Sequence, residues 1–267
     1  MITSKLERFR RALWTWRQPL TRRPADTATQ ISDLFVWRNS REWQTSFELI
    51  DLPALFADIG DAVARYATMV VFDQNGHRFL EIRLDLLPNR RQTIDLSAFI
   101  GDSHGEVGTF AVFHSSYPPA LKNMGSFLAE RGYVSYRYRD APLRTYVHGN
   151  FDAIALGPKG ELEFLGASGL LPREYRLQHE MRGSVLYELG MVNTTAVIKH
   201  CTCQLISINT GMIISCQRVK LTPGGVQVIS FQINKSDTAR MVIKSRLVMA
   251  RPLVFRIQNY KLDVFHG

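Results

Sequence analysis

The sequence predicts a mainly β protein, made of two packed antiparallel β-sandwiches that carry an internal repeat. Three observations favour this class. After residue 45 the hydrophobic pattern changes from helical spacing to a period of two, which is typical of half-buried strands. Glycine and proline turns separate the alternating runs. One strand–turn–strand–turn–strand pattern recurs 135 residues further along the chain.

The repeat is defined by its turns. In its first copy a strand runs into Asn-Gly at Gly76, a strong hairpin signal, and the return strand breaks at Pro88. In its second copy the corresponding residues are Gly211 and Pro223, so in both copies the proline follows the glycine at a spacing of 12 positions. Repeated short strands with such turns favour immunoglobulin-like or jelly-roll-type sandwiches over a parallel α/β sheet.

The chain divides into three predicted parts. Residues 1–24 form a basic amphipathic arm, residues 25–172 a first β-sandwich domain with one helix, and residues 173–267 a second β-sandwich domain. The one helix is predicted near 119–131, because prolines precede it and a glycine follows it. A hairpin is predicted over 151–165, with Gly157-Pro158-Lys159-Gly160 as its turn.

Charge is concentrated in the arm. The whole chain carries +9, and seven basic residues against one acid give residues 1–24 a net charge of +6. An amphipathic helix is predicted from about residue 4 to residue 18, ending before Pro19. All four tryptophans lie in the first 43 residues, which we expect to contact a protein partner or an anionic membrane surface. The expected contact residues are Leu6, Phe9, Arg10, Leu13, Trp14, Trp16 and Arg17.

Two other interpretations of the arm stay open. It can dock on its own domain with its arginines solvated, or serve as a mitochondrial transit peptide. Three cysteines and the lack of a secretory signal favour the cytoplasmic side, with peripheral membrane attachment as one option. No run of about 18 apolar residues predicts a membrane-spanning helix. The nearly neutral body argues against nucleic-acid binding.

The stretch from 133 to 152 concentrates polar and aromatic residues. Tyrosines and arginines alternate on its first strand, and a polar row with the same period follows. Arginine supplies a fork for a carboxylate, and tyrosine a flat amphipathic surface for a sugar. The alternative is a solvated sheet face. The candidate residues for binding a glycan or a carboxylate are Tyr136, Tyr138, Arg144, Tyr146, His148 and Asn150.

Catalysis and metal binding are weaker hypotheses. His148 and Asp152 are the catalytic candidates, yet on one strand they would lie about 13 Å apart at ~3.3 Å per residue. Cys201 and Cys203, with His200 and Cys216, have no standard zinc spacing, so buried free thiols are predicted. A cluster of His114, His148 and His266 would require the fold to bring them together. No metal and no cofactor are predicted.

Two functions follow from these patterns. The sequence contains none of the standard phosphate-loop, dinucleotide, nucleophile-elbow or zinc-protease motifs. We therefore predict a non-enzymatic β-sandwich accessory or binding subunit that attaches through its basic, Trp-rich arm to a membrane surface or a larger protein assembly. The alternative is a carbohydrate-active or other polar-substrate enzyme that uses the 136–152 face.

Overall fold

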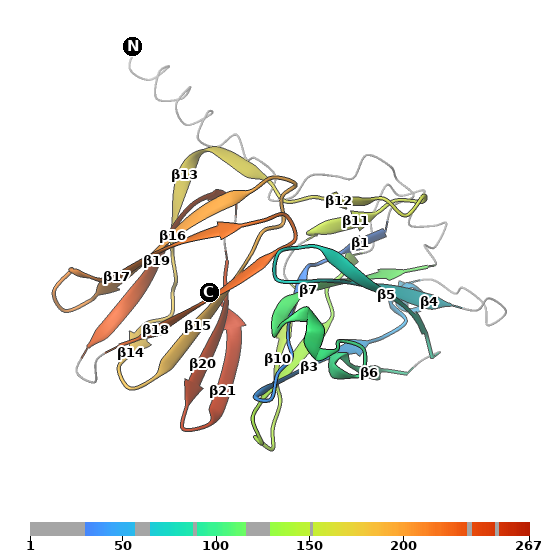
Figure 1. The fold of residues 1–267 in the computed structure, drawn as a ribbon, viewed down its shortest axis with the longest axis horizontal. Coiled ribbons are helices and arrows are strands. Elements are labelled where there is room, and N and C mark those ends of the chain that lie inside the picture. Colours follow the sequence, from blue (N-terminus) through green and yellow to red (C-terminus); the bar gives the residue numbers. More distant parts are fainter. Residues whose placement is uncertain are drawn as a thin grey trace, which may run out of the picture.

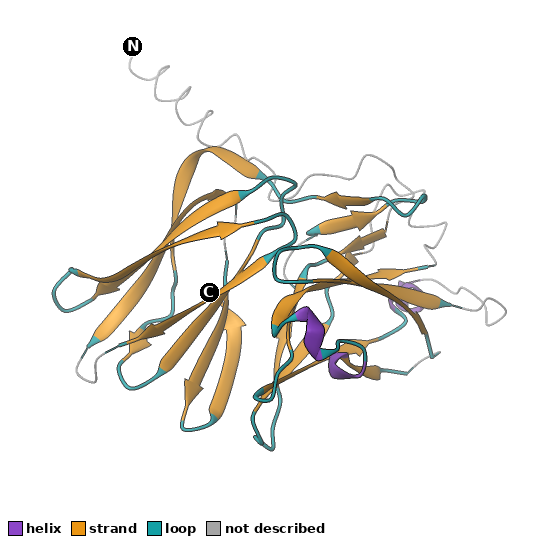
Figure 2. Ribbon diagram, viewed as in Figure 1, coloured by secondary structure: helices purple, strands orange, loops and turns teal. Residues whose placement is uncertain are grey.

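The structure is a computed structural model that consists almost entirely of β-strands. The residues it describes are 30–56, 65–87, 90–115, 129–149, 152–233, 237–248 and 251–267. Within them 21 strands form five sheets, which confirms the mainly β prediction (Figure 2). No helix in these ranges is long and apolar enough to cross a membrane. The predicted arm, with all its expected contact residues, lies outside the described residues.

Strands β1–β12 form what we call the first half. Its sheets have the orders β2-β7-β4-β5, β10-β9-β3-β6 and β12-β11-β1-β8 (Figure 1). Its helical turns are α2 (Leu52–Phe56), η1 (Leu96–Ala98) and η2 (Asp102–His104). The strands are β1 (Gln30–Ser32), β2 (Phe35–Arg38), β3 (Trp43–Leu49), β4 (Tyr66–Phe72), β5 (Arg78–Asp85), β6 (Gln92–Asp95), β7 (Val107–His114), β8 (Ala129–Glu130), β9 (Tyr133–Tyr138), β10 (Thr145–His148), β11 (Ile154–Leu156) and β12 (Leu162–Phe164).

Strands β13–β21 form the second half, which lies beside the first (Figure 1). Its sheets have the orders β13-β19-β16-β17, with β14 also on β19, and β18-β15-β20-β21. The domain boundary predicted between residues 172 and 173 falls within β13. The strands are β13 (Ser168–Arg176), β14 (Met181–Arg182), β15 (Leu186–Val192), β16 (Lys199–Ser207), β17 (Ile213–Leu221), β18 (Val226–Gln232), β19 (Thr238–Leu247), β20 (Leu253–Gln258) and β21 (Lys261–His266).

The hairpin signals in the sequence correspond to hairpins in the fold. Strands β4 and β5 pair antiparallel, and Gly76 in their turn has a φ of 80°, which glycine adopts without steric cost. The Asp73 carboxylate closes this turn by accepting hydrogen bonds from the amides of Asn75 and His77, both at 2.8 Å. Strands β11 and β12 also pair antiparallel, which confirms the hairpin predicted over 151–165.

The cysteines follow the alternation of their strands. Cys201 and Cys203 on β16 are buried free thiols, as predicted, whereas Cys216 on β17 is exposed. In the ladder Cys203 pairs with Gln217, while Cys216 pairs with Gln204, so the two thiols do not face each other. Cross-strand partners share a face of the sheet, which explains why Cys216 points to solvent. The buried-thiol prediction is therefore wrong for Cys216.

The end of the predicted 119–131 helix is a strand. Ala129 and Glu130 form β8, which pairs parallel with Ile31 and Ser32 of β1, and the amide of Asp33 donates to the Glu130 carbonyl at 2.9 Å. Tertiary pairing outweighs the local helical signal here. Residues 119–128 of that prediction lie outside the described part of the chain.

The largest core joins sheets of the first half. The buried ring of Phe47 on β3 lies 5.1 Å from Phe35 on β2 and 5.6 Å from Phe110 on β7. The same core takes in Phe255 of β20, whose ring lies 5.3 Å from that of Trp43 and 5.1 Å from that of Tyr136. Apolar side chains of both halves thus form one continuous core. Separating the two halves is unfavourable because it would expose aromatic surface to water.

The β18-β15-β20-β21 sheet is buried on both faces. Phe255 and Ile257 of β20 belong to the core shared with the first half, whereas Val254 on the same strand belongs to a second core inside the second half. Tyr187 and Leu189 of β15 also face this second core. Alternating side chains therefore connect one sheet to two cores.

Polar contacts also cross between the halves. Arg38 of β2 forms a largely buried ion pair with Glu188 of β15, and its guanidinium lies 3.6 Å from the Trp43 ring centroid. The Thr109 hydroxyl donates to the Gly224 carbonyl at 2.6 Å. Both contacts need the two halves in their present positions, so they reinforce the shared core.

Candidate functional site

Two of the three tyrosines among the predicted binding residues are core residues. Tyr136 is fully buried and its hydroxyl donates to the Val36 carbonyl at 2.7 Å, while Tyr138 packs 4.8 Å from the Trp43 ring. Burial raises the pKa of both phenols above the usual value. Neither ring is accessible to a ligand, and the exposed tyrosine of β9 is Tyr133, whose ring lies 6.3 Å from that of His148.

The face of each residue follows from the strand register. Tyr136 pairs with Thr145 across β9 and β10, whereas Tyr146 pairs with Ser135. Because cross-strand partners point to the same face, the even-numbered residues of β10 point away from the even-numbered residues of β9. Tyr146 and His148 are therefore exposed on the outer face of the sheet, not beside the two tyrosines.

The catalytic pair of the enzyme hypothesis is not assembled. The Asp152 carboxylate accepts a hydrogen bond from Arg131 Nε at 3.1 Å. The imidazole of His148 lies beside its own chain at the Gly149 carbonyl and 5.5 Å from the His266 ring. Within the described residues no contact joins His148 to Asp152, and Asn150 lies outside that part of the chain. These positions leave no acid–base couple at this face.

The histidines do not form a metal site either. His114 lies buried on β7, where its Nε2 is 2.6 Å from Glu130 Oε2. His266 donates from Nε2 to the His148 carbonyl at 2.8 Å. Among the described residues there is no group of three or more histidine, cysteine or acidic side chains that could hold a metal ion.

A cavity of about 780 Å³ lies where the two halves meet, and we call it the junction groove. Its walls are the β9–β10 turn, residues 139–145, and the β20–β21 turn, residues 259–263. The Thr145 hydroxyl donates to the Leu262 carbonyl at 2.7 Å and ties the two walls together. Ligand pockets concentrate at such interfaces, where two folded units supply side chains to one space.

The groove walls hold unusual backbone conformations. Arg139, Asn259 and Tyr260 have φ values of 51°, 49° and 65°, in the left-handed region that non-glycine residues seldom occupy. The Arg139 guanidinium lies 5.0 Å from the Tyr138 ring and 5.1 Å from the Tyr260 ring. Its Nε also donates to Glu42 at 2.8 Å, which fixes the position of this wall.

The groove offers cations, an aromatic ring and aliphatic surface to solvent. Tyr260 is 66% exposed and Leu143 is 80% exposed, while Lys261 is exposed beside them. Arg144 of the predicted binding residues also lines the groove, and its guanidinium donates to the Ser46 hydroxyl at 2.8 Å. An apolar floor with a few charged groups is the usual composition of a site for a small polar molecule.

Sequence reasoning found one wall of this groove and missed the other. It named Arg144 but not Tyr260 or Lys261, which lie more than 100 residues further along the chain. The sequence does carry a signal for the second wall: Asn259 and Tyr260 form a break between two runs of alternating polar and apolar residues. Only the shared core brings the two turns together.

Comparisons with known proteins do not assign a family. No protein-family model and no curated protein matches the chain. A solved structure described as that of the infectious bursal disease virus Gx strain is 12% identical over 84% of this chain, with a TM-score of 0.17. This chain spans about half, 54%, of that structure's chain. Similarity at this level carries no argument about fold or function.

Proposed function

We propose that the protein is a non-enzymatic binding subunit that holds an acidic glycan or similar carboxylate ligand in the junction groove. The observation that carries this proposal is the groove itself, a cavity built by both halves and lined by three cations, two carboxylates (Asp140 and Asp263) and an exposed aromatic ring. Arginine and lysine bind carboxylates, and Tyr260 offers a face against which a sugar ring can pack.

In the same proposal, the basic arm (residues 1–24) attaches the protein to a surface. Its net charge of +6 and its two tryptophans favour an anionic membrane surface or the acidic surface of a larger assembly on the cytoplasmic side. Lipid surfaces attract basic segments by about 1 kcal/mol per lysine or arginine, so seven basic residues suffice for reversible attachment.

In this proposal the two halves contain duplicated β-sandwiches of immunoglobulin-like or jelly-roll type, each made of eight strands, and β1, β8, β11, β12 and β14 stand outside the duplication. Strand order supports the duplication. When the eight strands of each half are numbered along the chain, the sheets β2-β7-β4-β5 and β13-β19-β16-β17 contain the same strands in the same order. The same holds for β10-β9-β3-β6 and β21-β20-β15-β18. Gly76 and Gly211 of the sequence repeat both have positive φ in corresponding turns. The junction groove thus lies between equivalent hairpins, β9–β10 and β20–β21.

Calorimetric titration with an oligogalacturonate tests the groove. We expect the wild-type protein to bind it and to ignore a neutral malto-oligosaccharide of equal length. Lys261→Gln should weaken binding roughly tenfold or more, because a charge-assisted hydrogen bond is lost. Lys220→Gln removes the same charge from an exposed position on β17 and should change nothing. Equal affinities of the two variants would contradict the proposal.

Vesicle sedimentation of the full-length protein tests attachment. Vesicles that contain phosphatidylglycerol should sediment the protein, and phosphatidylcholine vesicles should not. The double variant Arg10→Gln, Arg17→Gln should reduce sedimentation, whereas Arg218→Gln with Arg246→Gln removes equal charge from exposed body positions and should leave it unchanged. Sedimentation with neither lipid would exclude the membrane and leave the protein assembly as the partner, and equal sedimentation with both lipids would contradict attachment by charge.

A further inference from the structure

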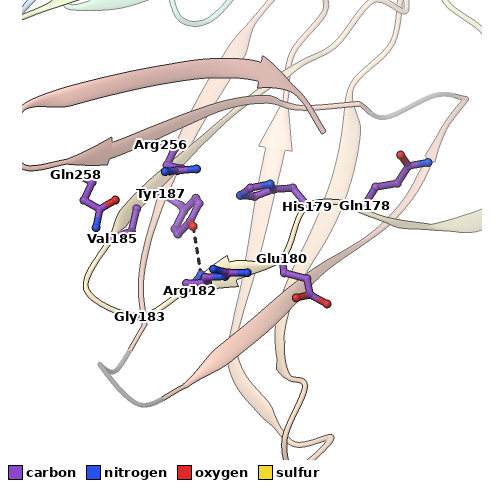
Figure 3. A pocket seen from close by; sticks show the side chains of 9 residues that line it. All are labelled: Gln178, His179, Glu180, Arg182, Gly183, Val185, Tyr187, Arg256 and Gln258. Carbon is purple, nitrogen blue, oxygen red and sulfur yellow. Dashed lines mark hydrogen bonds between the residues drawn. The ribbon is translucent and has the colours of Figure 1, made fainter.

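A second cavity, of about 580 Å³, opens at the edge of the second half, and we call it the arginine cavity (Figure 3). Its inner wall includes Tyr187, which is only 1% exposed and belongs to the second core. The segment between β13 and β14 forms the opposite side and contributes His179. The cavity is therefore the mouth of a packed β unit, a preferred place for a ligand site.

Hydrogen-bond donors gather at one end of this cavity. Figure 3 shows the side chains of His179, Arg182, Tyr187 and Arg256 turned toward a common space. The amide of Arg182 donates to the Tyr187 hydroxyl at 3.2 Å, so the phenol proton stays available to a ligand. The His179 ring lies 6.1 Å from that of Tyr187.

The two arginines are incompletely neutralised. Arg182 has no ion-pair partner among the described residues. Arg256 has Asp263 at 3.6 Å, well beyond the length of about 2.7–2.9 Å that a charge-assisted hydrogen bond takes. The acid of the cavity wall, Glu180, lies 3.6 Å from Arg240. Two guanidinium forks therefore have donors to offer to an added oxyanion.

The excess of positive charge affects the pKa of His179. Burial lowers its pKa, and the cations Arg256 and Arg182 lower it further, against weaker opposite effects of Asp263 and Glu180. A bound anion would reverse the arginine contribution and favour the protonated imidazole. Ligand binding and proton uptake by His179 are thus coupled at this position.

We propose that the arginine cavity binds the phosphate monoester group of a small polar ligand. Arg182 and Arg256 hold the phosphate oxygens, since guanidinium forks match phosphate geometry, and the Tyr187 hydroxyl donates to a third oxygen. Gln178 and Gln258 line the cavity at opposite ends (Figure 3), and their amides suit the hydroxyl groups of a sugar.

The neighbouring space favours a ligand larger than a free ion. A further cavity of about 610 Å³ shares Gln178 and His179 with the first and adds Arg176 and Arg251 to its lining. The two cavities together give room for the body of the ligand beyond its phosphate. A small-molecule pocket of several hundred Å³ has the right size for a phosphorylated sugar.

Calorimetric titration of the full-length protein with three probes tests this proposal. Glucose 6-phosphate should bind, inorganic phosphate should bind more weakly, and vesicles with phosphatidic acid decide whether the monoester can belong to a lipid. Vesicle binding that the Arg182→Gln, Arg256→Gln double variant loses assigns the site to a lipid headgroup, whereas vesicle binding that this variant keeps belongs to the basic arm. Tightest binding to the sugar phosphate assigns the site to a soluble ligand. No binding of any probe overturns the proposal.

Matched variants locate the site. Arg182→Gln with Arg256→Gln should weaken binding about tenfold or more, and Arg256→Lys should weaken it less because the charge remains. Arg218→Gln, which removes an exposed charge from β17, should leave binding unchanged, as should Lys261→Gln from the junction groove. The carboxylate site in the junction groove and the phosphate site in the arginine cavity can therefore fail independently of each other. Equal binding by the double variant overturns the arginine cavity, provided that its thermal melt matches the wild type.

The pH dependence gives a second readout. Binding should tighten as the pH falls through the pKa of His179, because the protonated imidazole stabilises the bound anion. The histidine resonances followed by NMR should show the His179 pKa rising when glucose 6-phosphate is added. His179→Gln should abolish the pH dependence that His179 contributes while leaving binding at high pH intact. A His179 pKa that does not move overturns its contact with the anion.

Discussion

At the residue scale, burial separates the three cysteines into two chemical classes. Burial raises the pKa of Cys203 to about 12 and also raises that of Cys201, while Cys216 faces solvent. The thiolate is the reactive form, and the raised values suppress it in both buried residues at neutral and mildly alkaline pH. Reactivity toward thiol reagents therefore depends on position along one hairpin.

Thiol titration measures this difference. In the native protein at pH 8 we expect an aromatic disulfide reagent to modify one thiol rapidly, and all three after unfolding in guanidinium. Cys216→Ser should remove the rapid reaction and leave the slow ones unchanged. Native mass spectrometry of the same sample should show no zinc and no loss of two hydrogens. Rapid modification of two or three native thiols would contradict the burial of Cys201 and Cys203.

At the element scale, the β4–β5 turn carries a contact between the halves. Gly76 combines a φ of 80° with close approach to the neighbouring turn, since a Cβ there would lie 1.9 Å from the Pro223 carbonyl oxygen. The amide of Val226 donates to the Gln74 carbonyl at 3.0 Å across the same contact. A side chain at position 76 must therefore displace backbone, not only another side chain.

Alanine at the two repeat glycines tests this contact. Gly76→Ala should destabilise the protein by about 2 kcal/mol or more, from the left-handed conformation and the clash together. Gly211→Ala is the matched control, because it has a φ of 70° but no atom within 4 Å of its Cβ position. It should cost about 1 kcal/mol. Thermal and denaturant unfolding give both values, and equal losses would refute the steric contact with Pro223.

Elements with local signals could be predicted, and elements set by long-range pairing could not. The turns at Gly76 and Gly211 follow from glycine chemistry and were found in the sequence. The face of Tyr136 depends on how β9 pairs with β3 and β10, because a shift of one residue reverses every side chain. Strand β8 exists only because Ala129 and Glu130 meet β1.

The same limit explains the candidate sites. Arg144 could be named because it begins a polar row of period two, whereas Tyr260 joins it only through the fold. The arginine cavity unites His179 and Arg182 with Arg256 across more than 70 residues. The sequence gives no indication that these distant residues lie close together in space, since each arginine alone is an ordinary surface residue.

At the scale of the whole molecule, the shared core predicts that the two halves unfold together. Phe255 of the second half packs on Trp43 and Tyr136 of the first, and the Arg38–Glu188 ion pair lies beside them. Breaking this contact exposes aromatic surface and leaves charges without partners, both of which cost free energy. Separate melting of the halves is therefore unfavourable.

Unfolding followed by two probes tests this coupling. In a background with Trp14 and Trp16 replaced by phenylalanine, the fluorescence of Trp37 and Trp43 reports on the first half and on the contact of Trp43 with Phe255, and far-UV circular dichroism reports on both halves. We expect the two probes to give one coincident transition. A circular-dichroism transition without a fluorescence counterpart would show that the halves are independent.

Two phenylalanine variants extend the test to the interface. Phe255→Ala should cost about 3–5 kcal/mol, because it opens a cavity in the core that both halves share. Phe231→Ala is the control, since Phe231 is equally buried but belongs to the second core. In a coupled molecule it should lower the fluorescence midpoint as well, although no tryptophan lies in the second half. If Phe231→Ala shifts only the circular-dichroism midpoint, the halves fold independently, and the junction groove would then rest on a weak contact instead of a shared core.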